Sequence, residues 1–148
     1  MKHANTAASE NIGEDARPAL LEKKRALEYQ TWHDPKNPEH YAELIWIESR
    51  LQQEEHIIEL FEKLNTLGGF SKISEERLSR AAIPAFHVLL KRRPLTEVEG
   101  LVEQVSALPA CKELDRWHLK AGLYFARENW PKVLKYAGLY WQQFKSID

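Results

Sequence analysis

Apolar residues recur along most of the chain at intervals of three and four positions. This is the spacing of residues that share one face of an α-helix, and strict alternation typical of strands is rare. We therefore expect an all-α fold of six or seven helices. The predicted helices begin at Pro18, cover 41–67 and 74–93, begin again at Thr96, and form a pair within 117–144.

Residues that favour helix ends support these boundaries. Ser74 precedes two glutamates and is a predicted N-cap, and Gly68 is a predicted C-cap. The T-x-x-E run from Thr96 to Glu99 has the form of a capping box. Asn129 is a predicted N-cap for the last helix, with a proline in its first turn.

Two positions leave the helical pattern ambiguous. The polar run 52–55 predicts either a turn or the solvated face of one long helix. Pro84 lies inside a helical pattern, where it removes one backbone hydrogen bond and predicts a kink or a break.

Composition predicts one folded domain. The chain has 148 residues, of which 43% are hydrophobic, and five of these are tryptophan, so it can bury a core. Residues 1–15 are small and polar without periodicity, which is typical of a disordered tail. We expect a single α-helical domain over 16–148.

Charge and cysteine content bear on the possible partners and the cellular compartment of the protein. The formal net charge of −1 gives no general attraction for nucleic acid. The one cysteine, Cys111, cannot form an internal disulfide and is compatible with a reducing compartment. No signal peptide and no membrane span are recognisable, so we expect a cytoplasmic protein.

The sequence lacks recognisable motifs for catalysis, phosphate binding or metal binding. We find no glycine-rich phosphate loop, no zinc-protease motif, no cysteine pair and no nucleophile elbow. The expectation is a protein that is not an enzyme, with no catalytic residues, no cofactor and no metal.

One stretch near the C-terminus resembles a known repeat. Trp117, Ala121, Tyr124 and Trp130 follow the bulky–small–aromatic–aromatic order of the tetratricopeptide repeat (TPR). Equivalent positions recur 35 residues earlier, close to the length of that repeat, and the resemblance covers about 38–144. It implies antiparallel helical hairpins stacked as a short superhelix.

The two earlier hairpins depart from the TPR pattern. Their small-residue position holds Ile45 and Phe86, which are large enough to push the helices apart. An irregular helical bundle is therefore the alternative architecture.

The resemblance also implies a binding surface. In TPR-like proteins the first helices of the hairpins line an inner groove that captures a segment of another protein. Transferring these positions to this sequence gives Trp46, Arg50, Arg80, Ile83, His87, Leu90, Lys91, His118 and Phe125.

The expected function is a protein–protein interaction module: an adaptor, a scaffold or a secretion-chaperone-like protein. One alternative is an immunity or inhibitor protein that caps an enzyme. A second is a nucleic-acid-binding regulator, since residues 111–148 hold seven Lys or Arg against four acids. The aromatic residues of that region have core spacing, which argues against base stacking. The sequence leaves a homodimer open.

Overall fold

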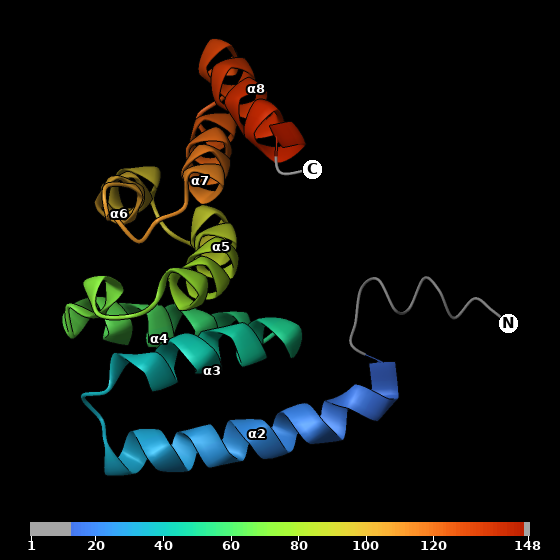
Figure 1. Ribbon diagram of the computed structural model, residues 1–148, viewed down its shortest axis with the longest axis vertical. Coiled ribbons are helices and arrows are strands. Elements are labelled where there is room, and N and C mark those ends of the chain that lie inside the picture. Colours follow the sequence, from blue (N-terminus) through green and yellow to red (C-terminus); the bar gives the residue numbers. More distant parts are fainter. Residues whose placement is uncertain (1–12, 147–148) are drawn as a thin grey trace, which may run out of the picture.

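The computed structural model describes residues 13–146 and confirms the all-α prediction for them. Seven α-helices and one short 3₁₀ helix are present in this part of the chain, with no strand (Figure 1). The elements are α2 (Gly13–His33), α3 (Pro38–Arg50), α4 (Glu54–Thr66), η1 (Gly69–Ser71), α5 (Glu75–Arg92), α6 (Leu95–Ser106), α7 (Glu113–Ala126) and α8 (Trp130–Ser146).

Short-range signals account for several helix ends. The side chain of Ser74 accepts a hydrogen bond from the Arg77 amide, as the predicted N-cap of α5 should. Asn37 caps α3 in the same way, and Pro38 occupies the first helical position. Gly68 adopts the left-handed conformation just after α4, with φ +63°.

The stretch 41–67 is two helices, because the polar run forms a turn. Gln52 has a left-handed φ of 60° and separates α3 from α4. Pro84 does not split α5, which continues through it to Arg92.

Two predicted helix starts and the predicted tail differ from the structure. Helix α2 begins at Gly13 and carries Pro18 inside it, so Pro18 does not open the helix. The predicted capping box is wrong: Pro94 is the N-cap of α6, without a side-chain cap. Pro94 fixes the extended backbone before the helix, which moves the start upstream of Thr96. Of the predicted tail, 13–15 belong to α2, and the rest lies outside the described residues.

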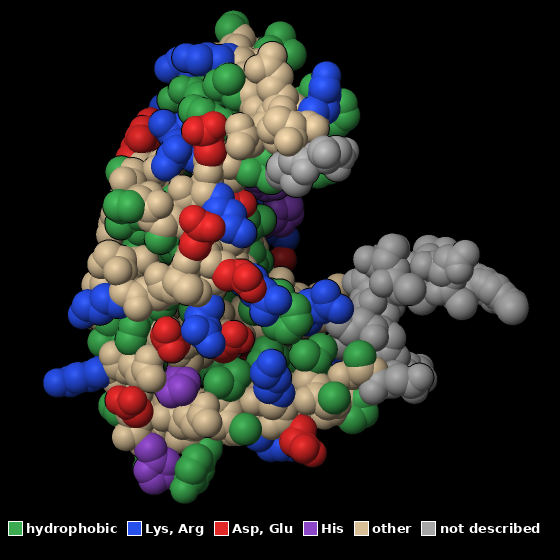
Figure 2. Space-filling model, in the orientation of Figure 1, with side chains coloured by type: hydrophobic (Ala, Val, Ile, Leu, Met, Phe, Trp, Pro, Cys, Tyr) green, Lys and Arg blue, Asp and Glu red, His purple; other side chains and the backbone are tan. Residues whose placement is uncertain are grey.

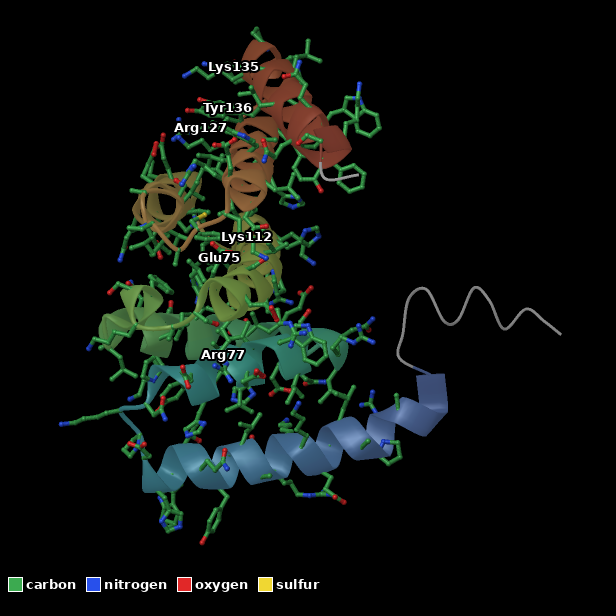
Figure 3. The ribbon with its side chains drawn as sticks, in the orientation of Figure 1. Glu75, Arg77, Lys112, Arg127, Lys135 and Tyr136 are labelled. Carbon is green, nitrogen blue, oxygen red and sulfur yellow. The ribbon has the colours of Figure 1, made fainter. Side chains whose placement is uncertain are left out.

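Neighbouring helices pack as pairs, and alternate helices also meet. Helix α3 packs against α4, α5 against α6, and α7 against α8, while α3 contacts α5 and α5 contacts α7. The helices thus rise in succession from α2 to α8, which form opposite ends of the molecule (Figure 1). Arg77 ties α5 to α3 through ion pairs with Glu39 and Glu43, at 3.3 and 3.4 Å (Figure 3).

The core is densest where α3, α4 and α5 meet. Phe61 of α4 contacts Phe70 and Phe86, with ring centroids 4.9 and 5.2 Å away. On α7 the fully buried residues are Leu119 and Leu123. The aromatic residues predicted to be core on α7 are only half-buried, because they face the outermost helix, α8.

Helix α8 is covered on one side only. Tyr136 stacks on Trp117 and Tyr124 of α7, yet no residue of α8 is fully buried. The prediction that Trp117, Tyr124 and Tyr140 are at least partly buried is confirmed, but Trp130 is exposed. No further helix follows within the described residues to cover the other side of α8.

None of the helices in residues 13–146 has the length and apolar character that a membrane crossing requires.

Gly69 is expected to be intolerant of a side chain. A Cβ there would lie 2.6 Å from Leu64 Cδ1 and 2.7 Å from Pro38 Cβ. Since η1 is held tightly between α3 and α4, we expect Gly69→Ala to lower the free energy of unfolding by about 2 kcal/mol. Chemical denaturation measures this loss.

Gly100 in α6 is the matched control for Gly69. A Cβ at Gly100 meets no atom within 4 Å, so Gly100→Ala should raise stability by up to about 1 kcal/mol. Equal effects of the two substitutions would contradict the tight packing of η1.

Candidate protein-binding groove

A groove of about 850 Å³ lies between α3, the start of α4, and α5. The right-hand side of the molecule in Figure 2 is hollowed above α3. The lining residues are Trp46, Ser49, Arg50, Gln52, Glu54, Ile57, Ser79, Arg80, Ile83, Pro84, His87, Val88 and Lys91.

Trp46 is the aromatic centre of the groove. Arg50 lies one helical turn further along α3, and its guanidinium carbon is 5.4 Å from the Trp46 ring. Arg80 reaches the same ring from α5, at 5.1 Å. Both distances are those of cation–π contacts, which hold the two guanidinium groups beside the indole.

The two arginines keep their hydrogen-bonding capacity. Both side chains are exposed, and neither guanidinium makes an ion pair or a hydrogen bond with another described residue. A guanidinium has five N–H donors in a rigid fork that matches a carboxylate. The groove therefore offers anchored cations with donors available to a ligand.

Lys91 differs from these arginines because it is already paired. Its ammonium lies 2.6 Å from Glu54 at the start of α4, and Arg92 also bonds that carboxylate. These hydrogen bonds hold the pKa of the Glu54 carboxyl below its usual value. Lys91 thus lines the groove as a member of an ion pair and does not offer a free charge.

A smaller hollow of about 60 Å³ continues the groove towards α7. Ile83 and His87 line both spaces, and Leu90 and His118 line the smaller one. The ring of His118 contacts Tyr140 of α8, with centroids 5.7 Å apart.

Eight of the nine predicted binding residues therefore line these two adjoining spaces. Phe125 does not: it is 62% exposed at the end of α7, where its ring contacts Trp130. Phe125 follows His118 by seven residues and shares its face of α7, but it lies two turns further along the helix, beyond the residues that line the two spaces.

The sequence reasoning missed the contribution of the α3–α4 turn and of α4. Gln52, Glu54 and Ile57 line the groove because the chain reverses at Gln52. The polar run 52–55 was the available signal, but its two interpretations place these residues on different faces.

Within residues 13–146, no cluster of three or more His, Cys, Asp or Glu could hold a metal ion. The ionisable groups lining the groove are instead Arg50, Arg80, Lys91, His87 and Glu54, so positive charge exceeds negative charge. With Trp46, Ile57 and Ile83 beside them, this arrangement suits a ligand with both apolar and acidic groups.

In comparisons with known proteins, no protein family, curated protein or solved structure matches this chain.

Proposed function

We propose that this chain is a non-enzymatic interaction module that binds an acidic, partly apolar segment of another protein in the groove. The TPR-like pattern of 117–144 suggested such a role. The observation that carries the proposal is the Arg50–Trp46–Arg80 cluster, because it combines an apolar surface with anchored, unpaired cations. A protein segment is the ligand class that presents both chemistries along an extended shape.

The open shape of the groove supports a protein segment over a small molecule as the ligand. It is an open trough between two helices and is continued by the hollow lined by Leu90 and His118. Small-molecule sites usually enclose most of the ligand surface.

The single cysteine is buried, and we place the protein in the cytoplasm as part of this proposal.

Reversing both free charges is expected to abolish partner capture. In Arg50→Glu/Arg80→Glu, the groove would repel the carboxylates that the native arginines attract. Losing charged interface contacts costs several kcal/mol, so we expect partner recovery to fall by roughly 30-fold or more. Quantitative mass spectrometry of proteins co-purified from source cells, with both baits at equal levels, measures this change.

The matched control is Arg25→Glu/Lys36→Glu, which changes the net charge equally. Arg25 lies on α2 and Lys36 in the α2–α3 loop, both exposed and away from the groove. The control should retain the partner, and both variants should keep the helical circular dichroism of the native protein. Undiminished capture by the groove variant would refute the proposed site.

A further inference from the structure

The outer side of α8 carries an apolar stripe that nothing in the described chain covers. The stripe consists of five exposed residues spaced by four, three, four and three positions. Leu134 is 75% exposed and Trp141 57%, although such residues usually lie inside. The members are Trp130, Leu134, Ala137, Trp141 and Phe144, and we call them the α8 stripe.

The spacing of the α8 stripe indicates what could cover it. Alternation of four and three is the heptad spacing by which one helix packs along another. The stripe runs the length of α8, and Phe125 extends it at the N-terminal end through its contact with Trp130. The surface therefore suits a partner helix with an apolar face of its own.

Charge restricts the partner further. Helix α8 has three lysines and no acidic residue. Lys132 lies over the Tyr124 ring at 4.7 Å, and Lys135 lies 5.2 Å from the centroid of Tyr136, whose ring stacks on α7. Lys135 and Tyr136 are labelled on α8 in Figure 3. Lys132 and Lys135 are thus engaged with rings at the α7–α8 contact, and the third lysine, Lys145, follows the last member of the stripe. The stripe itself contains no charged residue.

The exposed area of the stripe fits a self-association surface. Each large aromatic residue can bury roughly 150–250 Å², so the exposed parts of the stripe and Phe125 offer about 600 Å² per molecule. Two copies would together bury about 1,200 Å², the lower limit of specific interfaces. A second copy presents the same stripe, whose five members carry no charge.

We propose that a second copy of this chain covers the α8 stripe, with the two α8 helices antiparallel across a two-fold axis. The antiparallel arrangement keeps the two Lys145 side chains at opposite ends of the interface, whereas a parallel one would place them side by side. Ala137 and Gly138 leave room near the middle for Trp141 of the other copy. A Cβ at Gly138 meets nothing within 4 Å in its own chain, so this space is open.

Ala137→Glu tests the interface without disturbing the monomer. Ala137 is exposed, and glutamate is nearly as good a helix former as alanine. In the dimer, however, the substitution would place two carboxylates opposite each other in an apolar contact. We expect native protein to sediment at twice 17.3 kDa at micromolar concentration, and the variant to dissociate at least 100-fold more readily.

Ala26→Glu is the matched control, because Ala26 is exposed on α2 at the other end of the molecule. It should leave the dissociation constant unchanged, as should Arg50→Glu/Arg80→Glu, so this test is separate from that of the groove. A native protein that remains monomeric up to high micromolar concentration would overturn the proposal. So would a dimer that Ala137→Glu does not weaken, or a monomer that instead pellets with vesicles of anionic phospholipid.

Discussion

Phe61→Ala is expected to lower the free energy of unfolding by about 4 kcal/mol, the largest loss predicted for any substitution here. Phe61 is almost completely inaccessible, and its ring is held between Phe70 and Phe86. These three rings join α4 to η1 and α5, so removing the middle one leaves a cavity where three elements meet. The loss combines the transfer free energy of a benzyl group with the cost of that cavity.

The measurement is equilibrium denaturation in urea, with circular dichroism as the probe. Phe125→Ala is the matched control, because it removes the same side chain from an exposed position. Both substitutions are best compared in the Ala137→Glu background, so that association does not contribute. We expect the control to lose less than about 1 kcal/mol. Similar losses at the two positions would contradict a packed core at Phe61.

Glu48→Ala is expected to cost about 3 kcal/mol. The Glu48 side chain is completely buried on α3, and its Oε2 forms an ion pair with Lys24 of α2, at 3.1 Å, and a hydrogen bond with His56 of α4. Removing the carboxylate leaves the ammonium of Lys24 without its partner at a largely covered site. Breaking a buried pair by removing one member costs several kcal/mol, reduced here because Lys24 and His56 retain some solvent contact.

Glu59→Ala on the exposed side of α4 is the control for this loss, and it should change stability by less than about 0.5 kcal/mol. The double variant Lys24→Met/Glu48→Met gives a second check. Replacing both partners by apolar groups of similar volume should recover much of the loss. If Glu48→Ala and Glu59→Ala were equally mild, Glu48 would not be the buried link between α2, α3 and α4.

The groove shows how far a sequence pattern can locate a site. The residues placed along α3 and α5 line one surface because residues three and four apart share a helix face, whatever the helix packs against. Lys91 also lines this surface, but its ammonium is paired with Glu54 at the start of α4. That pairing joins residues 37 positions apart, and no local rule predicts it.

The helix ends also show which features local sequence predicts and which depend on tertiary contacts. Ser74 and Gly68 were predicted correctly because a cap or a left-handed residue acts within one turn of the chain. The Thr96 capping box failed because two local signals competed, and Pro94 decided the start. The turn within 41–67 allows α4 to bury Ile57 and Phe61. This burial stabilises the fold through tertiary contacts, which the local sequence does not reveal.

The sequence alone therefore determined the fold class, most helix positions and the faces on which the groove residues lie, because these follow from short-range backbone and side-chain chemistry. Only the tertiary structure decided which apolar face of each helix is covered. Trp117 and Leu119 are both compatible with a core position on α7, yet α5 and α6 bury the second more fully. The α8 stripe looks like core in the sequence and is exposed in the structure, because burial requires a neighbouring helix and the described chain supplies α8 with only one.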